Sequence, residues 1–329
     1  MTTRLLLAAG LLCALQPAAA AADSVEISEW LVPWEKSEPR AAHVAGDGRV
    51  WFVGRRADYV ANLAPETGQF SRYDLPAGTG PQDLAIGSDR FVWVAGNGQG
   101  YIGRLDPATA KVDRFAMPDR DADDPRTLAI DARGNIWFTV ETGNFVGKLS
   151  LPDGDVTLLR VPTRKARPYG ITVNSRDEPW VAESGRNSLI SIDPKTMTLA
   201  EIELPDEDAR PRRVVTTSDD SVWWTDYERG RLGRLDPRSG EFREWPMPGG
   251  KDSRPFGMAV DSFDRIWIVE TGRSPNRFIG FDTAQQVFFS ATDIPSGGGS
   301  VGHLCYYAPA GEVWFASDSN YIGRARVHP

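Results

Sequence analysis

A segment that opens with proline recurs along the chain, and its spacing leaves few folds open to a sequence of 329 residues. Successive copies are 42 to 44 residues apart. The opening prolines are Pro39, Pro81, Pro125, Pro168, Pro211 and Pro255, and a seventh copy begins near Val301. One tryptophan in every copy recurs at intervals of 42 to 47 residues: Trp51, Trp93, Trp137, Trp180, Trp223, Trp267 and Trp314. We expect these seven indoles to pack in the core.

The third copy, PRTLAIDARGNIWFTVETGNFVGKLSLPDGDVTLLRVP, shows what one unit contains. Apolar runs with β-branched or aromatic residues cover 127–130, 135–140, 145–149 and 156–161, which predicts four strands. Glycine, asparagine, aspartate and proline separate the runs, as tight turns require, and no interval has room for a helix. Repeats of this length with four strands are typical of propeller blades. The sequence therefore predicts an all-β fold, a seven-bladed β-propeller of four-stranded antiparallel blades.

The two ends of the sequence indicate how the ring closes. The last copy stops after its third strand, while residues 25–33, VEISEWLVP, precede the first copy. That segment resembles the fourth strand of copy five, GEFREWPMP at 240–248. We therefore expect the N-terminal strand to complete the last blade, which leaves no open sheet edge at the seam.

Residues 1–22 have the pattern of a signal peptide: Arg4, an apolar run, and small residues that offer Ala-x-Ala cleavage sites. The run is too short to span a membrane, and no other apolar stretch is long enough. The alternative is a lipoprotein signal that is cleaved before Cys13, although Leu12 stands where a small residue is expected. The prediction is a secreted or periplasmic protein with one domain, 23–329, in which Cys305 is the sole cysteine and no internal disulfide can form.

The charge balance limits the partners of the protein. The sequence has 45 acidic and 37 basic residues, a net charge of −8, and no basic run. This composition argues against nucleic acid or an anionic membrane as a partner. A monomer that binds a small-molecule or peptidic ligand is expected.

Equivalent positions around the ring suggest where such a ligand binds. The strand that starts at each opening proline lies nearest the axis, so the residues beside these prolines should crowd one end of a central channel. The candidate ligand-binding residues are Arg126, Tyr169, Arg212, Phe256 and Arg254. Carboxylates follow the repeat tryptophans at Glu141, Glu183, Asp226, Glu270 and Asp318. These charges either pair with one another around a partly buried channel or form a funnel for a polar ligand.

Three stretches carry a family resemblance. They are RPYGITV with PWVAESG in 167–185, RPFGMAV with IWIVETG in 254–272, and RLGRLDP in 231–237. The pattern resembles the virginiamycin B lyase (streptogramin B lyase) family of seven-bladed propellers, and the resemblance covers all seven copies. The resemblance implies an enzyme that opens cyclic depsipeptide antibiotics at the ester by elimination. It also implies a Mg²⁺ ion held by glutamates and a histidine that transfers the proton.

The functional residues of the family match this chain only in part. A family histidine that follows the proline of the sixth copy corresponds to Phe256. The Glu-Pro-His of the last blade corresponds to 300–302, with His303 one position later. By resemblance His303 is the catalytic candidate, and Glu270, Asp318 and Glu183 are the candidate metal ligands for Mg²⁺.

The other two histidines are predicted to have structural roles or to be exposed. His43 replaces a small residue of the first strand and is expected at a sheet interface, and His328 is expected to be exposed. Isolated histidines are more often structural than catalytic. Two functions therefore stay open: a lyase of the resembled kind, or a non-catalytic periplasmic propeller that binds a ligand or protein in its central funnel.

Overall fold

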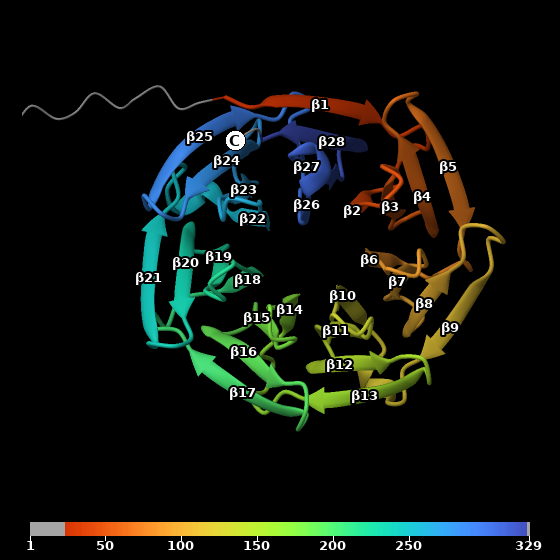
Figure 1. Ribbon diagram of the computed structural model, residues 1–329, viewed down its shortest axis with the longest axis horizontal. Helices are drawn as coiled ribbons and strands as arrows, with labels where there is room; N and C mark the ends of the chain where they lie inside the picture. The colour runs from red at the N-terminus through yellow and green to blue at the C-terminus, as the bar shows by residue number, and fades with distance from the viewer. Residues whose placement is uncertain (1–23, 328–329) are drawn as a thin grey trace, which may run out of the picture.

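The computed structural model describes residues 24–327, in which seven four-stranded antiparallel sheets stand in a ring (Figure 1). This confirms the predicted seven-bladed β-propeller. The predicted signal peptide, 1–22, and His328 lie outside the described residues, so both stay predictions. We number the blades 1 to 7 in chain order of their innermost strands.

The first three blades contain strands β2 to β13. Blade 1 comprises β2 (Pro39–Val44), β3 (Val50–Gly54), β4 (Tyr59–Ala64) and β5 (Gln69–Asp74). Blade 2 comprises β6 (Pro81–Ile86), β7 (Val92–Gly96), β8 (Tyr101–Leu105) and β9 (Val112–Ala116). Blade 3 comprises β10 (Pro125–Ile130), β11 (Ile136–Val140), β12 (Phe145–Ser150) and β13 (Asp155–Arg160).

The remaining blades contain β14 to β28 and β1. Blade 4 comprises β14 (Pro168–Val173), β15 (Pro179–Glu183), β16 (Ser188–Asp193) and β17 (Thr198–Glu203). Blade 5 comprises β18 (Pro211–Thr216), β19 (Val222–Asp226), β20 (Arg231–Asp236) and β21 (Glu241–Pro246). Blade 6 comprises β22 (Pro255–Val260), β23 (Ile266–Glu270), β24 (Arg277–Asp282) and β25 (Val287–Asp293). Blade 7 comprises β26 (Leu304–Tyr307), β27 (Glu312–Ser317), β28 (Tyr321–Arg326) and β1 (Glu26–Leu31).

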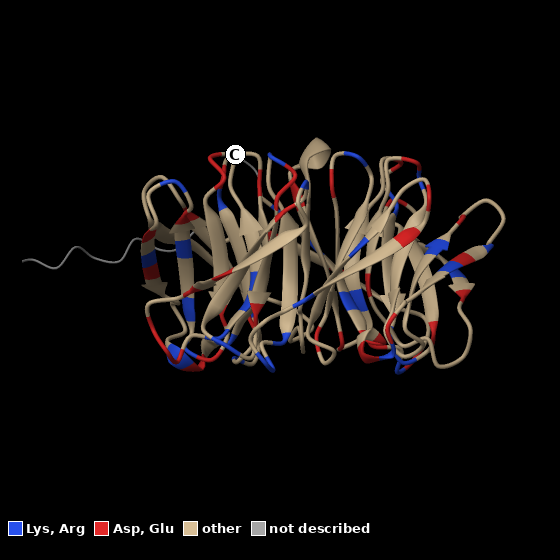
Figure 2. Cartoon of the chain, turned by 90° about the horizontal axis from the view of Figure 1, so that it is seen from below, with Lys and Arg blue, Asp and Glu red and all other residues tan. Residues whose placement is uncertain are grey.

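Short helices occur in three connections: η1 (Arg120–Ala122), η2 (Lys251–Ser253) and η3 (Ala308–Ala310). Within 24–327, no helix has the length and apolar character needed to cross a membrane. Acidic and basic residues are mixed at both ends of the ring, in the loops and on the outer strands (Figure 2). Neither end therefore presents a single sign of charge.

The seam of the ring is closed by the first strand of the described chain. β1 pairs antiparallel with β28, from Glu26 opposite Arg326 to Leu31 opposite Tyr321. The ring of Trp30 stacks on that of Trp314, with centroids 5.4 Å apart. The predicted completion of the last blade by the N-terminal segment is thereby confirmed.

The core consists of layers between neighbouring blades. In one layer Trp137 of blade 3 packs with Val181 and Ile190 of blade 4. All seven repeat tryptophans are at most 5% exposed, so the prediction that they form the core is confirmed. Burial of such large rings is a major favourable term for folding.

A glycine in the third strand of several blades has a packing role. Gly147, Gly233 and Gly323 each lie against an aromatic ring of the adjacent second strand, and a methyl group at any of them would overlap that ring. The repeated glycine therefore makes room for the aromatic core. This explains part of the repeated motif without reference to chemistry.

One end of the channel gathers the opening residues, and we call it the entrance end. Each opening proline pairs with the last residue of the second strand, as Pro168 does with Glu183 and Pro255 with Glu270. A register shift follows each of these six prolines, so a β-bulge lies at the start of every innermost strand except β26. Bulges re-aim side chains, and here they bring two consecutive residues toward the axis.

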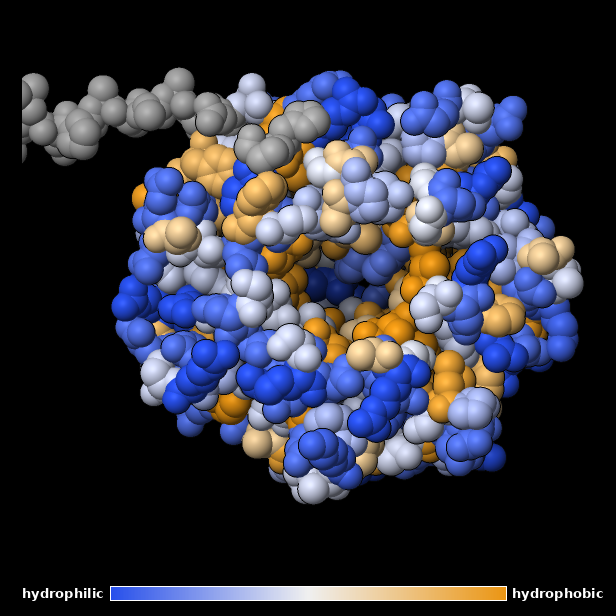
Figure 3. Space-filling model, in the orientation of Figure 1, coloured by the Kyte–Doolittle hydropathy of each residue, from blue (hydrophilic) through white to orange (hydrophobic). Residues whose placement is uncertain are grey.

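The centre of the ring is hollow. In a view along the axis, hydrophobic side chains surround the mouth of the hollow and hydrophilic side chains lie deeper (Figure 3). The polar groups in the channel are therefore set back from the surface in this view. Such groups need partners within the protein or from a ligand.

Candidate functional site

A small cavity, which we call the entrance cavity, lies among the innermost strands near the entrance end. The volume open to the centre of a water molecule is about 20 Å³. That is room for about one water or a single ion. Its polar lining includes Arg40, Gln82, Arg126, Tyr169, Arg213 and His303. A larger ligand would have to lie outside the cavity and insert one group.

Four of the predicted ligand-binding residues lie together beside this cavity. Nη2 of Arg126 donates a hydrogen bond to the Tyr169 hydroxyl at 2.9 Å, and the guanidinium lies 4.3 Å from the tyrosine ring centroid. Arg212 lies 4.4 Å from the ring centroid of Phe256 and 5.0 Å from that of Tyr169. Arg254 stands further away, 5.9 Å from a neighbouring tyrosine ring. A role for these residues in ligand binding stays a prediction.

The two aromatic side chains of this group support the arginines more than they offer surface. Tyr169 is 3% exposed and Phe256 is 4% exposed. Cation–π contacts of this kind are strongest where water is excluded. The arginines are therefore the groups that a ligand would meet.

The phenol of Tyr169 is unusually acidic. Burial by itself would raise its pKa, but the positive charges of Arg126, Arg213 and Arg212 lower the pKa of Tyr169 to about 8. The hydrogen bond from Arg126 contributes in the same direction. Tyr169 can therefore donate or accept a proton at a mildly alkaline pH.

Several arginines at the entrance end lack a carboxylate partner. Among the described residues, no salt bridge involves Arg40, Arg212 or Arg213, whereas Arg126 pairs with Glu141 at 2.8 Å. The Nε atoms of Arg40 and Arg212 are buried without a hydrogen-bond partner. The side chains around the cavity therefore carry more positive than negative charge, which would favour an anionic group of a ligand.

The carboxylates predicted near this end mostly have partners within the protein. Glu141 directly follows Val140, the residue that pairs with Pro125. Its carboxylate forms ion pairs with Arg126 and Arg167. Glu270 pairs with Arg277 at 2.6 Å, and Asp226 pairs with Arg229 at 3.1 Å. The pairing that the sequence left open, between these carboxylates and the arginines beside the opening prolines, is therefore present for Glu141. Glu270 and Asp226 pair instead with other arginines of their own blades.

Glu183 is the exception. Its side chain is fully buried and has no ion-pair partner among residues 24–327; Oε2 accepts a hydrogen bond from Ser188, and Oε1 has no partner. Burial raises the pKa of Glu183 to about 7. A carboxyl group that titrates near neutrality can act as an acid or a base.

The three candidate magnesium ligands do not form a ligand set in the described chain. Glu183 and Glu270 end the second strands of blades 4 and 6, and Asp318 follows that of blade 7 and accepts from the Ser300 amide at 2.6 Å. In residues 24–327, one group of three potential ligand residues has its ligand atoms within 4.8 Å of one another, and it contains none of these carboxylates. Magnesium at these positions stays a prediction from the resemblance.

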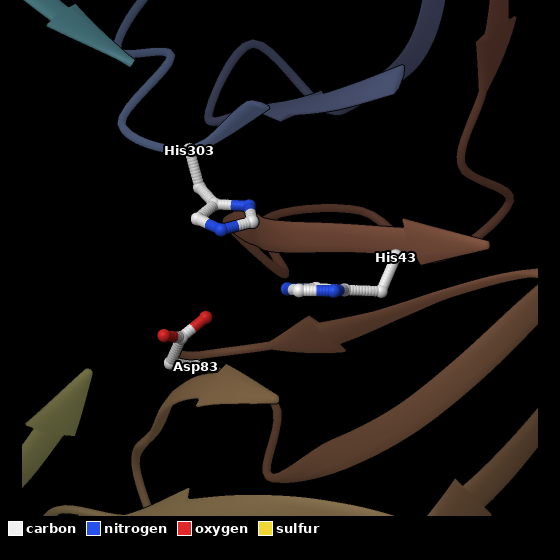
Figure 4. A group of neighbouring side chains, drawn as sticks. All are labelled: His43, Asp83 and His303. Atoms are coloured by element: carbon white, nitrogen blue, oxygen red, sulfur yellow. The ribbon is translucent and has the colours of Figure 1, made fainter. Parts of the chain in front are cut away.

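That group consists of His43, Asp83 and His303, whose side chains point toward a common space (Figure 4). They come from blade 1, blade 2 and the residue preceding β26 of blade 7. The two imidazole rings are stacked, with centroids 4.6 Å apart. His43 was expected at a sheet interface; its ring lies at the inner edge of blade 1 and meets the catalytic candidate His303.

Burial and Arg213 determine the charge states in this group. Burial lowers the pKa of His43 to about 4, with a further decrease from Arg213. Burial, His43 and Arg213 hold the pKa of His303 well below its ordinary value. Burial raises the pKa of Asp83 to about 6, although Arg213 and backbone amides oppose the rise. At neutral pH both imidazoles are therefore uncharged and Asp83 is mainly ionised.

Asp83 and Arg213 were not among the predicted site residues. The predicted residues follow the opening prolines directly, whereas Asp83, Arg213 and His303 occupy the second position of their copies. In the copies of blades 1, 4 and 6 this position holds only alanine or glycine. A charged residue or histidine at a position that is otherwise small was the available signal.

Comparisons with known proteins agree with the architecture. A model of the virginiamycin B lyase family matches residues 17–278. A selenomethionine-substituted virginiamycin B lyase from Staphylococcus aureus is 22% identical with a TM-score of 0.83, over 93% of this chain and 100% of that chain. A streptogramin B lyase structure is 24% identical with a TM-score of 0.83, over 92% of this chain and 98% of that chain. No protein of curated function matches significantly.

Propellers with other roles are similar as well. A hydrazine synthase structure from Kuenenia stuttgartiensis is 13% identical with a TM-score of 0.74, over 90% of this chain and 97% of that chain. At such identities structural likeness establishes the fold alone. Function has to be argued from the side chains of the channel.

Proposed function

Since the chain belongs to the virginiamycin B lyase family, we propose that it is an exported carbon–oxygen lyase that opens a cyclic ester or depsipeptide by elimination. The observation that carries the proposal is the neutral imidazole of His303 in a cavity with surplus arginines. A neutral imidazole can accept a proton, and guanidinium groups can stabilise a carboxylate.

The proposed step needs only these groups. His303 takes a proton from the carbon next to a carbonyl, a carbon–carbon double bond forms, and the neighbouring carbon–oxygen ester bond breaks. The released carboxylate lies near Arg213 or Arg126, whose charges stabilise it as it develops. Tyr169 holds Arg126 in place by accepting the hydrogen bond from its Nη2. The product has the mass of the substrate because no water is added.

The size of the cavity restricts how a substrate binds. About 20 Å³ cannot enclose a depsipeptide ring. The ring would therefore lie across the entrance end, with the ester group turned toward His303. The magnesium ion that the family resemblance implies has no assembled carboxylate set here, so we assign it no step.

The direct test is incubation of the purified mature protein with a streptogramin B, followed by liquid chromatography and mass spectrometry. A product of unchanged mass with altered retention and fragmentation is expected from the wild type and not from His303→Ala. The control is Val287→Ala on the outer strand β25, where the side chain is 45% exposed. Equal turnover by His303→Ala and the wild type would overturn the role of His303.

The alternative is a non-catalytic propeller that binds an anionic small molecule or peptide. It is favoured by Phe256 and Gly302, which occupy the first positions of the last two copies where the resembled family has histidine. This function predicts no ring opening, together with a rise in melting temperature on adding an anionic ligand. Arg213→Ala should remove that rise.

Export is part of the proposal and rests on the pattern in residues 1–22. Expression of the full chain in a bacterium, followed by fractionation and N-terminal sequencing, tests it. A mature protein that begins near residue 23 in the periplasm or medium is expected. Full-length protein in the cytoplasm would contradict it.

A further inference from the structure

We infer that His43, Asp83 and His303 form a binding site for one divalent transition-metal ion, such as Zn²⁺ or Co²⁺, where the inner edges of blades 7, 1 and 2 meet (Figure 4). This site is separate from the carboxylates at which the family resemblance suggests magnesium. Metal binding is measured without substrate, so its test is independent of the lyase test. While an ion occupies the lone pair of His303, this imidazole cannot accept a proton, so metal binding and the proposed elimination exclude each other at this residue.

The geometry is the first support. One ligand atom from each residue lies within 4.8 Å of the other two. Zinc binds imidazole nitrogen and carboxylate oxygen at about 2.0–2.2 Å, so ligand atoms around it are about 3–4 Å apart. Movements of about 1 Å, within reach of small side-chain rotations, would bring the three atoms onto one ion.

Unsatisfied ring nitrogens are the second support. Nε2 of His43 and Nδ1 of His303 are buried and have no hydrogen-bond partner among the described residues. A buried polar atom without a partner costs about 1–3 kcal/mol. A metal ion on one imidazole nitrogen, with water on the other, would satisfy both rings. Histidine binds metal ions through a neutral imidazole nitrogen.

The carboxylate is held in place by the backbone. Oδ1 of Asp83 accepts from the Leu84 amide and Oδ2 from the Leu128 amide, each at 3.0 Å. Outer contacts of this kind orient the ligands of metal sites. Each oxygen keeps a second lone pair, so the amides do not use up the capacity of Asp83 to bind a cation.

The donor set indicates the class of metal. Two imidazoles and one carboxylate suit zinc, iron, cobalt or nickel, whereas magnesium and calcium prefer oxygen ligands. Three protein ligands leave at least one position of the ion for water or another group. His303 also lines the entrance cavity, so that position is accessible from it.

Arg213 affects the strength of the site. Its Nε donates to the Gly302 carbonyl at 2.6 Å, and its charge acts on all three members of the group. One carboxylate does not balance an arginine and a divalent ion together. We therefore expect the remaining coordination position to bind an anion, such as hydroxide or a small carboxylate, and metal affinity to rise when Arg213 is replaced by methionine.

The test uses the mature protein, first treated with EDTA and then dialysed. Titration with Zn²⁺ in a calorimeter, and equilibrium dialysis with elemental analysis, should give one ion per chain. His43→Ala and Asp83→Asn should each weaken binding by about 10- to 100-fold or more. Val287→Ala, at a side chain that is 45% exposed on the outer strand β25, and His328→Asn should not change it, and Mg²⁺ in excess should not displace Zn²⁺.

A spectroscopic measurement on the wild type avoids dependence on variants that fail to fold. Co²⁺ bound by two imidazoles and a carboxylate should show visible absorption bands, and zinc should abolish them. Absence of stoichiometric binding, retention of binding in both His43→Ala and Asp83→Asn, or loss of binding in Val287→Ala would each overturn the inference.

Discussion

Glu183 provides the sharpest test of the electrostatics of this propeller. Equivalent positions in blades 5 and 6 hold Asp226 and Glu270, and both pair with an arginine. Glu183 is equally buried but has only Ser188 as a partner. The same repeat position therefore holds two paired carboxylates and one that has to ionise without a counter-charge. Replacement of Glu183 by glutamine removes that ionisation while the shape of the side chain is kept.

The magnitude follows from the pKa. The difference between a folded pKa of about 7 and the ordinary value of 4.5 corresponds to about 3 kcal/mol. The folded protein holds this proton more tightly than the unfolded chain, so the free energy of unfolding decreases as pH rises from 4.5 to about 7. Above pH 7, burial of the ionised Glu183 carboxylate lowers the free energy of unfolding by this full amount. We therefore expect Glu183→Gln to be about 3 kcal/mol more stable than the wild type near pH 8, and nearly equal to it near pH 4.5.

The assay is guanidinium chloride unfolding followed by tryptophan fluorescence at a series of pH values, with EDTA present so that no metal contributes. The matched control is Glu270→Gln, which makes the same chemical change in blade 6. It leaves Arg277 without its carboxylate and should lower the stability near pH 8 by about 3 kcal/mol. Parallel stability curves for the wild type and Glu183→Gln would show that burial of Glu183 does not perturb its ionisation, and would refute the raised pKa.

Three further outcomes are expected. Tyr169 should ionise near pH 8, visible as phenolate absorbance in the near ultraviolet, and Tyr169→Phe should lack this early step; a first phenolate near pH 10 in the wild type would contradict the arginine effect. Trp30→Ala should lower the free energy of unfolding by about 3 kcal/mol because it empties the seam, whereas Leu31→Ala, 60% exposed, should change it by less than about 0.5 kcal/mol. Gly233→Ala should cost about 2 kcal/mol, measured by denaturant unfolding, because its methyl group would overlap an indole ring; a neutral effect would show that the second strand can move away.

Most of the architecture could be predicted from the sequence because the repeat carries it. Apolar runs and turn residues mark the strands, and Trp137 with its equivalents marks the second strand of each blade. The similarity of the segment at 25–33 to a fourth strand was enough to predict the closure by β1. These features are local and periodic, so no knowledge of distant contacts is needed.

The channel could be predicted only in part. Spacing indicates where an innermost strand begins, but not the bulge after the proline that brings a second residue to the axis. For that reason Arg126 and Tyr169 were found and Asp83 was not. The stacking of His43 on His303 joins blades 1 and 7, which are adjacent only because the ring closes. Partners of the acidic residues are equally unpredictable, since Arg277 and Arg229 come from different parts of their blades.

The pairing at the seam has a mechanical consequence. Glu26, at the start of β1, lies opposite Arg326, at the end of β28, so both ends of the described chain leave the ring side by side. A force that pulls these ends apart would break the hydrogen bonds between β1 and β28 one after another, starting at Glu26 and Arg326. It would not load all of these hydrogen bonds at once. The propeller should therefore begin to unfold at low force in a single-molecule pulling experiment, even though its interior is densely packed.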